Sequence, residues 1–108
     1  MRVYVSGAIS NRIRANRIRV FAEVSERLRA RGHTVVNPLD RQPDADGHHP
    51  ESVEYWRASL KLDIVRLLAC DAVYMLVGWR NSRGARLERT IAKRLGLRVI
   101  YAPGRKHE

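Results

Sequence analysis

Glu88 is the residue of this sequence whose position most strongly indicates chemistry. At 100° per residue along a helix, it falls within the arc of its apolar neighbours, whereas Arg86, Arg89 and Lys93 occupy the opposite face. The apolar neighbours are Ala85, Ile91, Ala92 and Leu95. A carboxylate on a buried helix face must be paired, hydrogen-bonded or functional, because burying an unpaired charge is costly. Two interpretations therefore stand at this point, an internal ion pair with an arginine and a catalytic carboxylate.

Asp63 is a second carboxylate with the same character. On its helix it lies beside Trp56, at the edge of the apolar stripe, instead of on the solvent side with Lys61. Two acids near one sheet edge could divide the work of nucleophile and proton donor. Asp71 is different, because it falls where a helix gives way to a strand, and we expect it to be a turn or capping residue.

Two loops next to these acids carry residues that could hold a ligand. Gly7, Ala8, Ile9 and Ser10 follow the first apolar run and lead toward a helix, so their backbone N–H groups could cradle a phosphate or a ribose hydroxyl. This loop is not a G-x-G-x-x-G fingerprint, and a plain strand-to-helix turn explains it equally well.

The second loop runs from Gly78 to Gly84 and contains Trp79 and Ser82. A tryptophan beside polar and glycine residues at a strand end could stack on a base, or it could pack over the edge of the sheet. Both interpretations of Trp79 remain open from the sequence. Ser82 and Gly84 are included among the candidate substrate-binding residues.

The elements that must position these residues alternate as β-α-β-α-β-α-β. The predicted strands are short and rich in Val, Ile or Tyr, and they span Arg2–Ser6, His33–Val36, Ala72–Val77 and Arg98–Tyr101. Right-handed crossovers then give a mainly parallel four-stranded sheet, which is an α/β, Rossmann-like or flavodoxin-like three-layer sandwich. In such sheets ligands bind beyond the carboxyl ends of the strands, where both loops lie.

Three amphipathic helices connect the strands. The apolar stripe of the first is Ile18, Phe21, Val24 and Leu28, and Gly32 follows its end. The stripe of the second, which starts after Ser52, is Val53, Trp56, Leu60, Ile64 and Leu67. The third runs from about Gly84 to Leu95. The loop before the second helix contains His48 and His49, which we interpret as solvated.

The composition fits one small domain. We expect residues 1–108 to form a single domain, with 103–108 as a flexible tail, because 44% hydrophobic content suffices for one core. There is no apolar run of membrane-spanning length and no signal peptide pattern, so the expected location is the cytoplasm. Cys70 is the single cysteine, and no Cys/His cluster has zinc-ligand spacing, so neither a metal nor a cofactor is expected.

The formal net charge of +10 offers a rival function, nucleic-acid binding. However, the basic residues are spread over every segment, without the aromatic interleaving of a single-strand platform. Among the 21 basic residues only Lys61, Lys93 and Lys106 are lysine, a bias that a GC-rich coding sequence would also produce. Nucleic acid is therefore a possible partner but not the favoured one.

From Arg2 to Tyr101 the sequence resembles the nucleoside 2-deoxyribosyltransferase-like family, which includes nucleoside-monophosphate N-glycosidases and small, often phage-encoded relatives. The motifs that carry the resemblance are VYVSGAIS over Val3–Ser10, Asp63 followed eight residues later by Asp71, and SRGARLE over Ser82–Glu88. Their order and spacing together are more specific than any one of them.

The resemblance implies a role for each matching residue. Glu88 matches the nucleophilic glutamate, Asp63 the aspartate that positions the nucleoside or helps to protonate the leaving base, and Tyr4 a tyrosine near the sugar. The Gly7–Ser10 loop matches the one that holds a 5′-phosphate, although Ala8 lacks a hydroxyl that some relatives place there. Ser82 stands where the monophosphate hydrolases carry a serine, which favours a hydrolase acting on a nucleotide.

The predicted function is therefore cleavage of the N-glycosidic bond of a (deoxy)nucleoside or its monophosphate, by hydrolysis or deoxyribosyl transfer, without a cofactor. The resemblance also implies a homo-oligomer. The alternatives are a non-catalytic nucleotide-binding or regulatory module and a basic nucleic-acid-binding protein. Cleavage of nicotinamide from NAD is a related chemistry that no motif favours.

Overall fold

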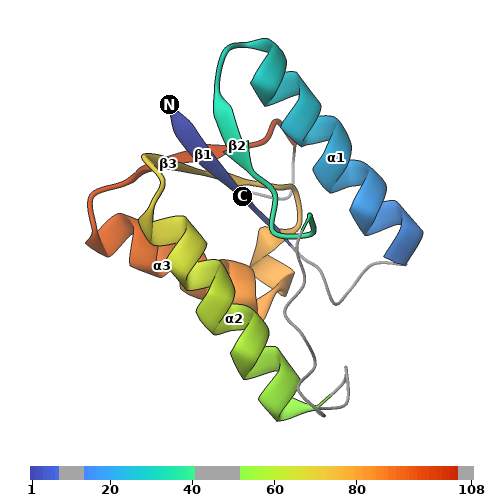
Figure 1. Ribbon diagram of the computed structural model, residues 1–108, viewed down its shortest axis with the longest axis vertical. Helices are drawn as coiled ribbons and strands as arrows, with labels where there is room; N and C mark the ends of the chain where they lie inside the picture. Colours follow the sequence, from blue (N-terminus) through green and yellow to red (C-terminus); the bar gives the residue numbers. More distant parts are fainter. Residues whose placement is uncertain (8–13, 41–51, 105–108) are drawn as a thin grey trace.

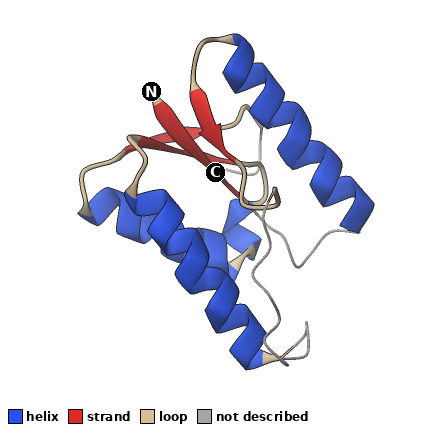
Figure 2. Ribbon diagram, viewed as in Figure 1, coloured by secondary structure: helices blue, strands red, loops and turns tan. Residues whose placement is uncertain are grey.

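The computed structural model describes residues 1–7, 14–40 and 52–104, which form a four-stranded sheet and three α-helices (Figures 1 and 2). In chain order the elements are β1 (Arg2–Ser6), α1 (Arg14–Ala30), β2 (Thr34–Val36), α2 (Val53–Leu68), β3 (Ala72–Met75), the 3₁₀ helix η1 (Trp79–Asn81), α3 (Arg83–Arg94) and β4 (Arg98–Tyr101). His48 and His49, and the predicted tail beyond Gly104, lie outside the described residues.

The sheet has the order β2-β1-β3-β4, and every pair of neighbouring strands is parallel. Helix α1 covers one face, and α2 and α3 cover the other (Figure 1). The predicted α/β three-layer sandwich with a parallel sheet is thus confirmed. Two predicted strands are longer than the observed ones, since β2 begins at Thr34 and β3 ends at Met75.

The side chains of β1 alternate between the two helical layers, as the two-residue period of a strand requires. Val3 and Val5 pack in the core cluster that includes Phe21 of α1. Tyr4 belongs to the opposite cluster, which includes residues of α2 and α3. Ser6 has the same parity as Tyr4 and is also fully buried. The central strand therefore presents two hydroxyl groups to the layer that contains α3.

Three residues predicted in apolar stripes are exposed, two near the starts of α1 and α2 and Leu95, 54% exposed, at the end of α3. Ile18 of α1 is 47% exposed and Val53 of α2 is 59% exposed. Both helices run antiparallel to the strands, so their first turns extend past the carboxyl edge of the sheet and find no strand to cover (Figure 1). Deeper positions of the same stripes, Phe21 and Leu67, are completely buried.

Local signals set several helix ends as predicted. Ser52 caps α2, because its hydroxyl accepts a hydrogen bond from Tyr55 N at 3.1 Å. Gly32, after α1, has φ 92°, a conformation that favours glycine.

None of the described helices combines the length and the apolar character that a membrane span requires.

Candidate active site

Glu88 lies at the centre of a buried polar cluster on the α3 side of the sheet. Its side chain projects from α3 toward β1 and is only 6% exposed. Tyr4 Oη donates a hydrogen bond to Glu88 Oε2 at 2.6 Å, and Ser6 Oγ donates one to Oε1 at 2.6 Å. Such short O–H···O⁻ distances are typical of charge-assisted hydrogen bonds. Each carboxylate oxygen is therefore held by a hydroxyl group of the central strand.

The sequence of α3 explains how a glutamate reaches this depth. Ala85 and Ala92, three residues before and four residues after Glu88, are fully buried, and their small side chains let the helix lie close to the sheet. Ser82 fixes the start of the helix, because its hydroxyl accepts a hydrogen bond from Ala85 N at 3.1 Å. The helix start thus sets the angle at which Glu88 meets β1.

The ion-pair interpretation of Glu88 finds no support in residues 1–7, 14–40 and 52–104. The side-chain ion pairs within these residues join Arg29 to Asp40 and Arg66 to Asp63, and neither includes Glu88. Burial raises the pKa of Glu88, and the hydrogen bonds from Ser6 and Tyr4 oppose this rise. Hydroxyl donors, instead of a guanidinium, therefore stabilise the ionised carboxylate.

Tyr4 acts as a hydrogen-bond donor in this cluster. Its pKa is raised far above the usual value, first by burial and then by the negative charge of Glu88. The phenol consequently keeps its proton at any physiological pH. Its role in the cluster is to orient and stabilise the carboxylate.

Ser6 is a residue of this cluster that the sequence analysis did not select. A signal for it was present, since Tyr4 and Ser6 have the same parity in a predicted strand and must point to the same face. A hydroxyl at the carboxyl end of a central strand is also where a ligand site is expected.

Asp63 approaches the cluster from α2. Its side chain is 16% exposed, and its Oδ1 lies 3.5 Å from Arg66 Nη1, which also donates a hydrogen bond to the carbonyl of Pro38 at 3.1 Å. Burial, followed by the charge of Glu88, raises the pKa of Asp63 to about 7, while Arg66 partly opposes the shift. Near neutral pH this acid is therefore divided between its protonated and ionised forms.

The structure favours the packing interpretation of Trp79 over base stacking. Trp79 is 5% exposed and belongs to the core cluster on the α3 side. The guanidinium carbons of Arg80 and Arg89 lie 5.3 Å and 4.7 Å from the centroid of its ring, and the Tyr101 ring lies 6.0 Å away. These neighbours occupy the surroundings of the indole that a base would need.

The remaining predicted site residues are glycines and residues of the first loop. The backbone of Gly7, after β1, lies close to the Leu76 side chain, since a Cβ added to Gly7 would lie 2.8 Å from two carbons of Leu76. Ala8, Ile9 and Ser10 lie outside the described residues. Gly84 lies in the first turn of α3, with no described atom close to the position of a Cβ.

Asp71, predicted as a capping residue, does have a structural role. Its Oδ2 accepts a hydrogen bond from Arg2 N at 2.9 Å, at the amino ends of β1 and β3 and so at the opposite edge from Glu88.

In the described part of the chain, no group of three or more His, Cys, Asp or Glu residues is arranged to hold a metal ion.

The parallel sheet with helices on both faces defines an α/β protein, and the buried acid lies at the carboxyl edge of this sheet. A solved structure, the 2-deoxyribosyltransferase of the psychrotolerant bacterium Bacillus psychrosaccharolyticus, is similar with a TM-score of 0.73 over 94% of this chain and 71% of that chain, at 20% sequence identity. None of the curated proteins compared with it matches the sequence. The chain belongs to the family described as domain of unknown function DUF4406, which matches residues 1–101.

Proposed function

We propose that this protein cleaves the N-glycosidic bond of a nucleoside or nucleoside monophosphate, with Glu88 as the attacking carboxylate. One observation carries the proposal: a nearly inaccessible glutamate has both oxygens hydrogen-bonded to hydroxyl groups, and no described cation neutralises it. A carboxylate held in this way is oriented, ionisable and still has lone pairs for a reaction. The similar solved structure supports this choice, because its name is that of a 2-deoxyribosyltransferase.

In the proposed reaction one Glu88 oxygen forms a bond to the anomeric carbon while the bond from that carbon to the base nitrogen breaks. The electron pair of the broken bond leaves with the base. The resulting glycosyl ester is then cleaved by water, which gives the free sugar, or by a second base, which gives a new nucleoside. Tyr4 and Ser6 hold the carboxylate throughout, so that little reorganisation accompanies the attack.

Asp63 is the proposed proton donor to the departing base. A useful general acid has a pKa near the working pH, and burial together with Glu88 places the pKa of Asp63 at about 7. Burial raises the pKa of both acids, but the hydroxyl donors oppose this rise at Glu88, whereas the neighbouring charge of Glu88 adds to the rise at Asp63. This division of nucleophile and acid is what cleavage of the glycosidic bond requires.

Hydrolysis of a monophosphate is the preferred form of the proposal. It rests on the resemblance at Ser82 and on the Gly7–Ser10 loop as a phosphate cradle. Following the same resemblance, we propose that the protein is a homo-oligomer. Its proposed location in the cytoplasm rests on the sequence pattern alone.

The test is chromatography of a panel of nucleosides and nucleoside 5′-monophosphates after incubation with the purified protein. We expect release of a free base, and a loss on the order of 10³-fold or more in Glu88→Gln. Glu26→Gln is the matched control, because Glu26 is an exposed glutamate on α1 on the other side of the sheet. If no substrate in the panel releases a base at any protein concentration, the proposal is wrong.

A further inference from the structure

Ser59 of α2 has a buried hydroxyl without a hydrogen-bond partner. Its Oγ is shielded from solvent, and it is the one side-chain polar atom in this condition among the residues that the structure describes. An unsatisfied buried hydroxyl is costly, and most buried polar groups in proteins avoid this state. Protein atoms cover this oxygen in the free protein, so a ligand reaches it only when those atoms move aside, and the bound ligand then supplies the missing partner.

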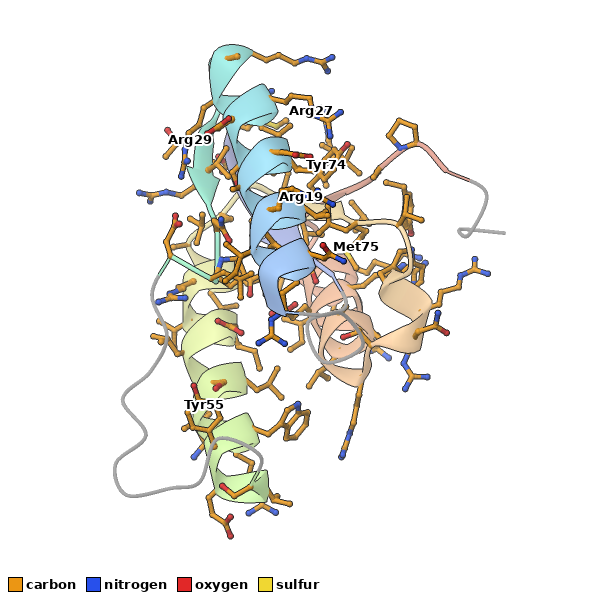
Figure 3. All side chains as sticks on the ribbon, turned by 90° about the vertical axis from the view of Figure 1, so that its right-hand side faces the viewer. Arg19, Arg27, Arg29, Tyr55, Tyr74 and Met75 are labelled. Carbon is orange, nitrogen blue, oxygen red and sulfur yellow. The ribbon has the colours of Figure 1, made fainter. Side chains whose placement is uncertain are left out.

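The position of Ser59 gives a ligand a reason to bind there. Ser59 precedes Asp63 by four residues, so the two side chains lie on the same face of α2, about 6 Å apart along the helix axis. Because α2 runs antiparallel to the strands, Ser59 lies on the outer side of Asp63 relative to the sheet. Figure 3 shows the first turns of α2, where the labelled Tyr55 lies away from the strands.

Gly84 gives α3 a matching feature one helical turn before Glu88. It precedes Glu88 by four residues, and a Cβ built there has no described heavy atom within 4 Å. A turn further out on α2, Arg83 joins the two helices, since its guanidinium carbon lies 4.5 Å from the centroid of the Trp56 ring. Between this contact and the two carboxylates, α2 thus offers an orphaned hydroxyl and α3 offers bare backbone.

We propose that the Ser59 hydroxyl hydrogen-bonds the nucleobase of the substrate and so determines which base is accepted. The inference rests on the proposed function, which places the sugar against Glu88 and the leaving base against Asp63. The base is then the part of the substrate that continues past Asp63 along α2, where Ser59 and Leu60 lie one turn earlier on that face and Ser59 is the polar one of the two. Gly84 leaves room for it on the α3 side.

The chemistry of a hydroxyl suits this task. A hydroxyl both donates and accepts hydrogen bonds, so it can pair with whichever ring nitrogen or exocyclic group the bound base turns toward α2. In the bound state the orphaned oxygen gains its missing partner. A base that cannot supply one leaves the hydroxyl unsatisfied and binds more weakly.

The test compares Ser59→Ala and Ser59→Cys with the parent protein, both in the active form and with Glu88→Gln, which allows the binding of intact substrate to be measured. Titration calorimetry with 2′-deoxynucleoside 5′-monophosphates of adenine, guanine, hypoxanthine, cytosine and thymine gives the Kd for each base. We expect the preferred base to bind on the order of 10-fold more weakly in both variants, with a smaller spread among bases. In the active form the ratio of kcat/KM between bases should fall in parallel.

Ser25→Ala is the matched control, because Ser25 is a buried helical serine on the other face of the sheet and its hydroxyl already donates to the Phe21 carbonyl at 2.7 Å. This control should keep the base preference unchanged. Removal of an orphaned hydroxyl should leave the Tm of Ser59→Ala unchanged or higher, which separates the effect from a loss of folding.

The outcomes distinguish the two proposals. Unchanged base preference in both Ser59 variants, in a protein that still releases a base, would overturn the role of Ser59 alone. A panel in which no nucleotide is bound or cleaved by the parent protein would overturn the proposed function and this inference together.

Discussion

Asp63→Asn should change how the stability of this protein depends on pH. Burial and the charge of Glu88 raise the pKa of Asp63 from 3.8 to about 7 in the folded state. A carboxyl group with a raised folded pKa favours folding while it is protonated. Its contribution is fully present below pH 3.8 and is lost as the pH rises through 7.

The magnitude follows from the size of the shift. One pKa unit corresponds to about 1.4 kcal/mol, so a shift of roughly three units makes the free energy of unfolding fall by about 4 kcal/mol between pH 4 and pH 8. Asparagine resembles the protonated form and does not titrate. The variant should therefore match the parent protein near pH 4 and exceed its stability by up to about 4 kcal/mol at pH 8.

Urea unfolding followed by circular dichroism at several pH values between 4 and 8 would measure this difference. Asp40→Asn is the control, because Asp40 is exposed and its ion pair with Arg29 lies on the surface, where such pairs contribute about 1 kcal/mol or less. A difference between Asp63→Asn and the parent protein that stays constant over the whole range would refute the reasoning. It would also remove the basis for Asp63 as a general acid.

Two further predictions concern β1 and the loop after it. Tyr4→Phe removes a hydrogen-bond donor from the buried Glu88 carboxylate and should lower the free energy of unfolding at pH 8 by about 1–3 kcal/mol. The loss should be smaller at pH 4, because the Glu88 carboxyl is more protonated there. Equal losses at the two pH values in urea titrations would contradict this prediction. Gly7→Ala would place a Cβ 2.8 Å from Leu76 and should cost about 1–3 kcal/mol, seen as a lower Tm in calorimetry, whereas an unchanged Tm would show that Leu76 moves without cost.

The local elements could be predicted because their signals are local. The residue types of β1 and β4 gave both strands with their observed bounds, and Ser52 marked the start of α2 through a capping interaction within four residues. The exposed residues Ile18 and Val53 show the limit of this approach. A helical stripe predicts which face is apolar, but where the sheet ends decides how much of that face is covered.

The partners of Glu88 could not be predicted from periodicity. The angular position of this glutamate on α3 indicated that it is buried, yet the choice between an ion pair and a functional site depends on what it meets. Tyr4 lies 84 residues away in the sequence and Ser6 lies 82 residues away, and no local pattern joins them to α3. The resemblance selected Tyr4, whereas Ser6 required the observed parity and packing of β1.

Trp79 shows a different reason for an open alternative. Its sequence context fitted a stacking platform and a packed side chain equally well. What separates them is the pair of arginines, Arg80 and Arg89, beside its ring, together with the neighbouring Tyr101. Arg80 is next to Trp79 in the sequence, but the contacts with Arg89 of α3 and Tyr101 of β4 depend on tertiary structure.

The central place of the first strand has a consequence for how the chain folds. Strand β1 pairs with β3, so Val3 lies opposite Ala72, and Arg2 N bonds to a side chain 69 residues away. Closing such a long loop is entropically slow, as is common for parallel sheets. During synthesis on the ribosome, β1 can pair with β2 first but stays without its second neighbour until β3 has emerged, and Glu88 follows later still. The polar cluster therefore assembles near the end of folding, and a nascent chain interrupted before α3 would leave the Tyr4 side of the sheet, which α3 covers in the folded protein, exposed to chaperones or to aggregation.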